Sequence, residues 1–112
     1  MSGNAIGEDG MSMDYEFDWD DAKAAANVVK HGVPFIEAMT VFSDSLAITF
    51  YDTAHSLDEE RWVTIGETSH AQLIVVIHTF VETGAASALV RLISARPATK
   101  NELRQYRDGL TQ

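Results

Sequence analysis

Cysteine and long apolar runs are both missing from this sequence of 112 residues. Without cysteine the chain can form no disulfide, which fits a reducing compartment. No apolar stretch approaches the roughly 20 residues that a transmembrane helix needs, and the first residues lack the basic and apolar regions of a secretory signal. We therefore expect a cytoplasmic protein that does not contact a membrane.

Basic residues are also scarce, because eight Lys and Arg stand against 17 Asp and Glu, which gives a formal net charge of −9. Residues 1–60 hold thirteen acidic and two basic residues, whereas residues 61–112 hold six basic and four acidic ones. Nucleic-acid binding depends on cations that neutralise phosphates. Any RNA contact must therefore use local arginines, mostly of the second half, while the acidic half suits a basic partner.

The remaining composition is that of one ordinary globular domain, with 46% hydrophobic residues. Residues 1–13 are rich in Gly, Ser and small polar residues and show no periodicity, so we expect a disordered tail or an expression remnant. Residues 14–112 then form a single domain, which at this size can bury a core without a structural metal.

Helix signals occur near both ends of that domain. Asp18 is expected to cap a first helix that ends just before Gly32, which suits the left-handed position after a helix. A second, short helix is expected to begin at Pro34. Near the C-terminus, Thr99 and Glu102 have the spacing of a capping box and predict the start of the last helix.

Strand-like segments fill the rest of the domain. A short one at residues 15–17 precedes the first helix, and four longer ones rich in Val, Ile, Thr and aromatic residues follow the second helix, at residues 46–51, 61–67, 73–80 and 86–95. The short connections between them favour antiparallel pairing. We therefore expect an α+β fold, with an antiparallel sheet of about four to five strands, two N-terminal helices and one C-terminal helix.

Several motifs follow one another in a fixed order along the chain. They are FDWD at residues 17–20, KHG at 30–32, FIEAMTVF at 35–42, HS-x-x-EERW at 55–62 and R-x-ISAR-x-AT at 91–99, followed by Glu102 and Tyr106. In this order, over about residues 15–107, the sequence resembles the BrnT family. It departs from the family pattern at Val81 and Leu103, where a basic residue is common.

The resemblance implies a RelE-like fold and a ribonuclease toxin of a type II toxin–antitoxin system that inhibits translation by cutting RNA. It also implies a cognate BrnA-like antitoxin, a ribbon-helix-helix protein, commonly in a complex of two toxins with two antitoxins. Such a complex contacts operator DNA only through the antitoxin. We expect no metal and no other cofactor, because four scattered histidines without cysteine give no zinc spacing.

Candidate catalytic residues follow from the chemistry of metal-independent RNA cleavage. The ribose 2′-OH attacks the adjacent phosphate, which requires a base, an acid and cations near the developing charge. Arginine suits the last role because its planar fork pairs with phosphate oxygens. The catalytic candidates are Arg61, Arg91, Arg96, His55, Glu59 and Glu60.

Each of these candidates also has a plainer explanation. The charge run around Arg61 can be a solvated surface with a weak ion pair, and the two later arginines can be solvated or paired with C-terminal carboxylates. In a regular strand Arg91 and Arg96 face opposite ways. One site can use both only if a bulge or the strand end redirects Arg96.

Candidate RNA-binding residues lie at the end of the first helix and along the last helix. They are Lys30, His31, Lys100, Arg104, Tyr106 and Arg107. The three basic residues of the last helix are spaced to form one stripe, which can contact RNA or simply face water. His31 can instead stabilise a helix C-terminus, Tyr106 can pack in the core, and His78 is expected to be a core histidine.

Two functional hypotheses remain open from the sequence, beside a weaker third in which the chain is an orphan scaffold with no toxin role. The first is a metal-independent endoribonuclease that a ribbon-helix-helix antitoxin neutralises. The alternative is a catalytically weak protein that acts mainly as an antitoxin-bound transcriptional co-repressor. The acidic net charge and the absence of arginine at Val81 favour this alternative.

Overall fold

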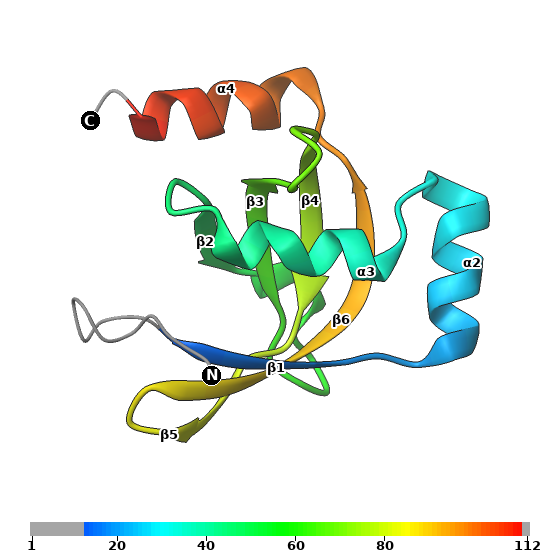
Figure 1. Cartoon of the computed structure of the whole chain (residues 1–112), viewed down its shortest axis with the longest axis vertical. Helices are drawn as coiled ribbons and strands as arrows, with labels where there is room; N and C mark the ends of the chain where they lie inside the picture. The colour runs from blue at the N-terminus through cyan, green and yellow to red at the C-terminus, as the bar shows by residue number, and fades with distance from the viewer. Residues whose placement is uncertain (1–12, 111–112) are drawn as a thin grey trace.

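The structure is a computed structural model that describes residues 13–110, so the expected N-terminal tail lies outside the described residues except for Met13. Its elements run in the order β1 Asp14–Asp18, α2 Asp21–His31, α3 Phe35–Ala38, the 3-10 helix η2 Met39–Ser43, β2 Ile48–Tyr51, the 3-10 helix η3 Thr53–His55, β3 Trp62–Glu67, β4 Leu73–His78, β5 Val81–Gly84, β6 Ser87–Pro97 and α4 Lys100–Leu110 (Figure 1). No helix within this range is long and apolar enough to cross a membrane.

The strands form one six-stranded sheet in the order β1-β6-β4-β3-β2, with β5 paired to β6. The pairs β2–β3, β3–β4, β4–β6 and β5–β6 are antiparallel, as their short connections predict. The α+β class is confirmed, but the sheet is mixed, because β1 pairs with β6 in parallel. The long stretch of chain between β1 and β6 permits that orientation, and no local signal distinguishes it.

The start of α2 and the segment after β4 are the main departures from the expected elements, and the bounds of the expected strands shift by one or two residues. Asp18 is still in β1, where it pairs with Arg91, so Asp20 caps α2 by accepting a hydrogen bond from the Lys23 N–H at 2.9 Å. The segment Val81–Gly84, expected to be a connection, forms β5. All four of its residues are exposed, so it lacks the apolar alternation that reveals a half-buried strand.

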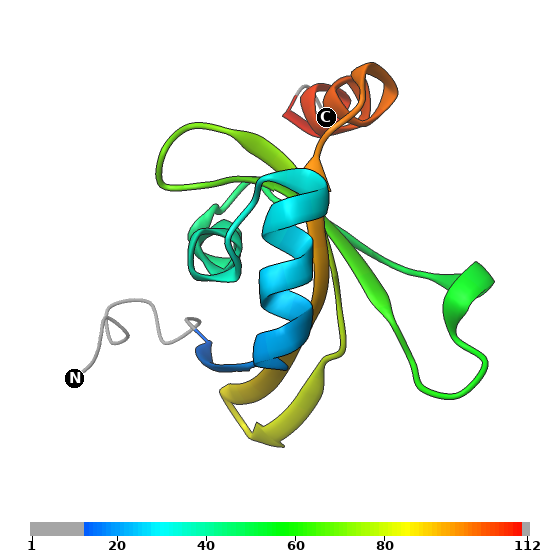
Figure 2. The same cartoon turned by 90° about the vertical axis from the view of Figure 1, so that its right-hand side faces the viewer.

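Hydrophobic clusters cover both faces of the sheet. Under α3, side chains of β4 and β6 pack against Val33, Phe35, Ala38 and Val41. On the opposite face, Ile65 of β3 and Val75 of β4 pack against Tyr106 of α4. Figure 2 shows α3 on one side of β6 and α4 at the far end of the other side, so much of that second face carries no helix.

The buried side chain of Asn27 joins α2 to β6. Its amide nitrogen donates to the carbonyl oxygens of Val33 at 2.9 Å and Ala95 at 2.8 Å, and its oxygen accepts from the Ala95 N–H at 3.1 Å. Gly32, with a φ of 74°, ends α2 as expected and lets the chain turn toward Val33. Asn27 therefore satisfies buried backbone groups that the sheet leaves unpaired.

Replacing Asn27 with alanine is expected to lower the free energy of unfolding by at least about 2 kcal/mol, because each buried group left unpaired costs about 1–3 kcal/mol. Urea unfolding followed by circular dichroism measures this change. The matched control is Asn101→Ala on the exposed surface of α4, which is expected to change stability by less than about 0.5 kcal/mol. Equal stability of the two variants would contradict the role given to Asn27.

Candidate active site

A bulge in β6 determines which way its arginines point. The pairing with β4 shifts from Ile77↔Ser94 to His78↔Leu92, which leaves Ile93 as the extra residue. As a result Leu92 and Ala95, three positions apart, pack in the same cluster under α3. Their neighbours Arg91 and Arg96 therefore both lie on the opposite face of the sheet, the arrangement that one shared site requires.

That open face holds a cavity of about 460 Å³. One row of paired residues crosses four strands beneath it, namely Phe50, Val63, Ile77 and Ser94. Four charged side chains also line the cavity, and they are Asp52, Arg61, Arg96 and Glu102. In Figure 2 this side of the sheet is bordered by α4 at one end and by the projecting connection between β2 and β3. The cavity thus combines a mainly apolar floor, with Ser94 at one end, and charges of both signs.

Arg96 is held firmly by the first turn of α4. Its two terminal nitrogens donate to the two carboxylate oxygens of Glu102, both at 2.7 Å. This pairing raises the pKa of Arg96 and lowers the pKa of Glu102 to about 2. Glu102 also accepts from the Thr99 N–H at 2.8 Å, and Thr99 Oγ1 accepts from the Glu102 N–H at 3.2 Å, which confirms the capping box.

Arg61 is positioned by the closed connection between β2 and β3. Its backbone N–H donates to the Ser56 hydroxyl at 3.0 Å, and its carbonyl accepts from the Asp52 N–H at 2.8 Å. The described ion pair of the guanidinium is a loose one, because Glu59 lies 3.9 Å from Nε. Nε itself is buried and has no hydrogen-bond partner among the described atoms. Compared with Arg96, this guanidinium is the more available for an anion.

Arg91 shares the open face but lies outside the cavity lining. Its carbonyl accepts from the Thr79 N–H at 3.0 Å, and its guanidinium pairs with Asp18 of β1 at 3.2 Å. The structure therefore brings Arg61 and Arg96 to one cavity and leaves Arg91 beside it, paired with its own carboxylate.

The other catalytic candidates are less closely placed. Glu59 borders a smaller neighbouring cavity together with Arg61, and the side chain of Glu60 is exposed. His55 ends η3, and its side chain lies outside what the structure describes. Neither Glu59 nor Glu60 is among the described residues that line the larger cavity.

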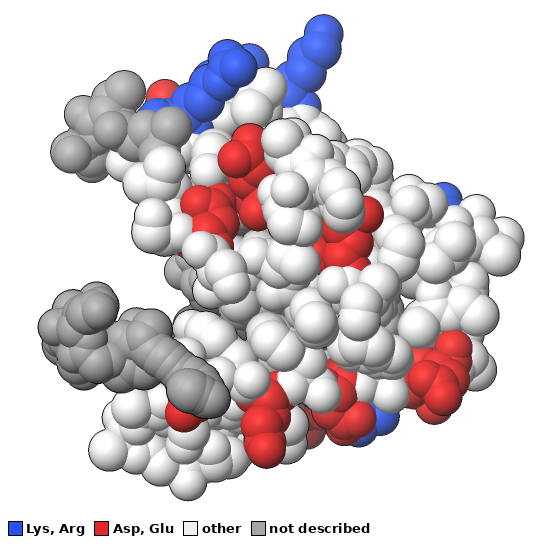
Figure 3. Space-filling model, in the orientation of Figure 1, with Lys and Arg blue, Asp and Glu red and all other residues white. Residues whose placement is uncertain are grey.

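The RNA-binding candidates divide into three groups. Lys30 and His31 lie in the last turn of α2, away from the cavity lining. Tyr106 is only 8% exposed and packs in the core, so it is not free to stack on a base. The side chains of Lys100, Arg104 and Arg107 on α4 are exposed, and Figure 3 shows basic side chains that project outward from this helix.

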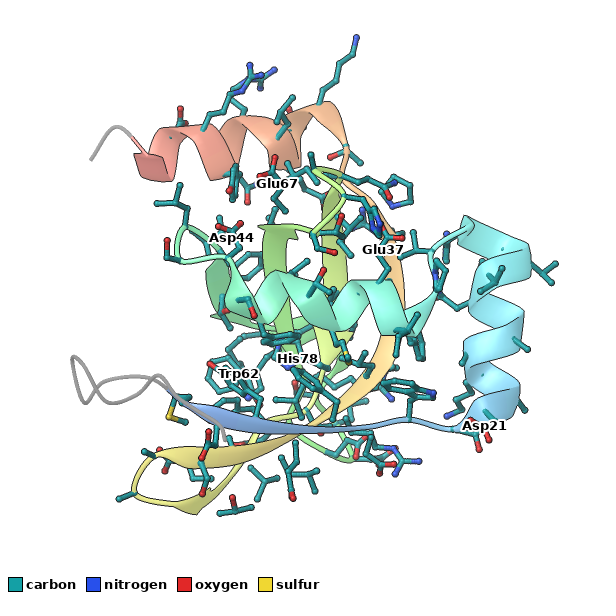
Figure 4. The ribbon with its side chains drawn as sticks, in the orientation of Figure 1. Asp21, Glu37, Asp44, Trp62, Glu67 and His78 are labelled. Atoms are coloured by element: carbon teal, nitrogen blue, oxygen red, sulfur yellow. The ribbon has the colours of Figure 1, made fainter. Side chains whose placement is uncertain are left out.

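Asp44 fixes α4 to the rest of the molecule. Its carboxylate accepts hydrogen bonds from the Tyr106 hydroxyl at 2.8 Å, the Glu67 N–H at 2.8 Å and the Leu46 N–H at 2.9 Å. Burial acts to raise the pKa of Asp44, but these bonds together lower it. Burial and the nearby Asp44 raise the pKa of Tyr106 to about 12. Figure 4 shows Asp44 and Glu67 beneath α4.

His78 is a core histidine, as expected. Nδ1 lies 2.9 Å from the Thr79 carbonyl, which can only accept, so Nδ1 carries the hydrogen. Burial lowers the pKa of His78, and the neutral ring then accepts at Nε2 from the Thr64 hydroxyl at 2.7 Å. Both ring nitrogens are satisfied within the α3 side of the sheet, beside Trp62 in Figure 4.

Three residues of the cavity are absent from the catalytic and RNA-binding candidates that the sequence predicts. They are Phe50, Asp52 and Glu102, and the sequence predicts for Glu102 only the role of a helix cap. Because residues i and i+2 of a strand share a face, the alternation around β2 carried a signal for the first two. Among the described residues no three His, Cys, Asp or Glu side chains are placed to hold a metal ion.

The comparisons with known proteins agree with this fold. A family model described as the ribonuclease toxin BrnT of type II toxin–antitoxin systems matches residues 19–102. The chain belongs to this family. It is similar to the crystal structure of the Brucella abortus ribonuclease toxin BrnT, with a TM-score of 0.54 and 26% identity over 79% of this chain and 100% of that chain. No curated protein sequence matches it.

The Arg96–Glu102 pair predicts a pH-dependent contribution to stability. Because the folded pKa of Glu102 is lowered to about 2, its contribution is complete above the unfolded pKa and is lost as the pH falls toward 2. Glu102→Gln is expected to lower the free energy of unfolding by roughly 1–2 kcal/mol at neutral pH, a value reduced for solvent screening. The difference from the unchanged protein should shrink as the pH falls from about 5 to 2.

Urea unfolding at a series of pH values measures this difference. Glu82→Gln, on the exposed strand β5, is the control and is expected to change stability by less than about 0.5 kcal/mol throughout. A difference for Glu102→Gln that stays constant down to pH 2 would show that the ion pair is not its source.

Proposed function

We propose that this chain is an endoribonuclease toxin that cleaves RNA without a metal ion, in the cavity between Arg61 and Arg96. The observation that carries the proposal is the gathering of two guanidinium groups and two carboxylates around one cavity on an open sheet face. The Brucella abortus relative is named a ribonuclease toxin, which supports it. Cleavage of cellular RNA would inhibit translation.

The residues suit the transfer of a phosphoryl group within the RNA chain. A base removes the proton from the 2′-OH, the 2′-oxygen bonds to phosphorus, and the bond to the 5′-oxygen breaks as an acid supplies a proton to that oxygen. The products are a 2′,3′-cyclic phosphate and a 5′-hydroxyl. Arg61 is the group that would pair with the non-bridging oxygens and stabilise their added charge.

The carboxylates of the cavity differ in how well they suit the role of base. Glu102, whose pKa is about 2, binds protons weakly and is already committed to Arg96. Asp52 is half-buried beside Arg61 and is the better base on position. Glu59, Glu60 and His55 remain candidates for proton transfer from the neighbouring connection.

The antitoxin proposed here is a basic protein of the BrnA-like, ribbon-helix-helix kind, bound in a complex of two toxins and two antitoxins. The family implies an antitoxin partner. Acidic side chains spread over the α3 side of the molecule in Figure 3, a surface that complements a basic partner. Operator DNA would then be contacted through the antitoxin, since this acidic surface repels a polyanion.

A second candidate function is that of an antitoxin-bound transcriptional co-repressor with weak catalysis. It is favoured by the ion pairs Arg91–Asp18 and Arg96–Glu102, which neutralise two of the three candidate arginines. Purified protein that cuts no RNA, yet strengthens antitoxin binding to operator DNA, would support this function over the nuclease.

Arg61→Ala is expected to abolish growth arrest when the toxin is expressed alone and to lower RNA cleavage by about 100-fold or more, because a transition-state cation is lost. Growth curves and cleavage of a labelled RNA measure the two effects. Lys23→Ala on α2 also removes one positive charge, at an exposed position away from the cavity lining. It is the matched control and should retain full toxicity. Full toxicity of a folded Arg61→Ala protein would refute the assignment of this site.

A further inference from the structure

We infer that Phe50 is a stacking platform for one nucleobase, and that the substrate is therefore single-stranded RNA with little preference for base identity. The inference rests on the proposed nuclease function and specifies its substrate class. It starts from the position of one aromatic ring next to Arg61 in the cavity.

Phe50 lies on β2, the strand at one end of the sheet order, where it pairs with Val63 of β3. Its side chain is 43% exposed and lines the cavity, although it belongs to one of the most hydrophobic residue types. Its neighbour Tyr51 points to the other face and contacts the Trp62 ring at 5.2 Å between centroids. Phe50 is thus the aromatic residue that β2 presents to the open face.

Among the described residues, the Phe50 ring belongs to neither hydrophobic cluster of the sheet. The aromatic pairs among the described residues join rings of the α3 side and of the Tyr51–Trp62 pair, and Phe50 belongs to none of them. A large apolar ring exposed in a cavity with two arginines suits a ligand that has both a flat apolar part and an anionic part. A nucleotide has both.

The spacing of Phe50 and Arg61 fits one nucleotide. Phe50 pairs with Val63, and Arg61 is two residues before Val63, so Phe50 and Arg61 are diagonal neighbours on one face, about 7–8 Å apart at Cα. A phosphate bound by Arg61 would therefore place an adjacent base over the Phe50 ring. Val63 and Ile77 form the floor next to that ring and offer no hydrogen-bonding side chain to a base edge. The polar Ser94 lies at the far end of the same row, on β6, and Asp52 lies on the side of Arg61.

This arrangement selects against a duplex. In double-stranded RNA the faces of the bases are covered by their neighbours, so none is available to an aromatic side chain. In a single strand any base can stack, because every base has an aromatic face. Single-stranded RNA is therefore the class that uses both Arg61 and Phe50.

The test is the binding of a short 2′-O-methyl RNA, which cannot be cleaved, to the full chain by fluorescence anisotropy. Phe50→Leu is expected to weaken binding by about 5- to 150-fold, since stacking is lost while an apolar side chain remains, and Phe50→Trp is expected to retain it. The salt dependence should be unchanged in Phe50→Leu, whereas Arg61→Ala should reduce the slope of log affinity against log salt by about 0.7. Tyr51→Leu is the matched control on the opposite face of β2 and should bind as the unchanged protein does.

The outcomes separate this inference from the proposed function. Unchanged single-strand affinity in Phe50→Leu, or equal affinity of the unchanged protein for a duplex of the same sequence, would overturn the stacking platform while the nuclease stands. If Phe50→Leu weakened only antitoxin binding, Phe50 would belong to that interface instead, and the inference would be wrong. An unchanged protein that neither binds nor cleaves RNA would overturn both.

Discussion

The bulge at Ile93 is the feature on which the rest of the site depends. β6 must bury Val90 and Leu92 under α3 at its start and Ala95 at its end, and strict alternation cannot place all three on one face. The extra residue resolves this conflict and carries Arg96 to the open face beside Arg61. Without it, a strand that keeps Val90 and Leu92 in the core would turn Ala95 to the open face and Arg96 into the core. A guanidinium buried there without a partner would have a large desolvation cost.

The site balances positive charge with acidic groups that the fold itself requires. Glu102 caps α4 and at the same time holds Arg96 in a fixed geometry, and Asp44 holds the same helix through Tyr106. Such pairs orient a guanidinium but also neutralise it. Arg61, whose described ion pair with Glu59 is a loose one, is therefore the arginine of the cavity better able to attract a phosphate in a protein of net charge −9.

Local signals in the sequence predicted local structure well. Gly32 marked the end of α2 and Thr99 with Glu102 marked the start of α4, because caps depend on a few adjacent residues. The parallel pairing of β1 and the bulge in β6 were not predictable, since both arise from contacts between distant segments. For the same reason Arg61 and Arg96 were selected by residue type, whereas Phe50 and Asp52 emerged only when the register of β2 and β3 was known.

Because the cavity has few free cations, the exposed ring of Phe50 matters more for its affinity for RNA. Electrostatic affinity for RNA grows with the number of phosphates neutralised, and this surface offers few unpaired guanidinium groups near the cavity. Affinity in such a site must draw more heavily on contacts that release no counterions, chiefly stacking and apolar contact. The exposed Phe50 ring beside Val63 and Ile77 supplies those contacts. The acidic net charge of the chain argues against RNA binding over the whole surface, but it is compatible with RNA binding at this cavity.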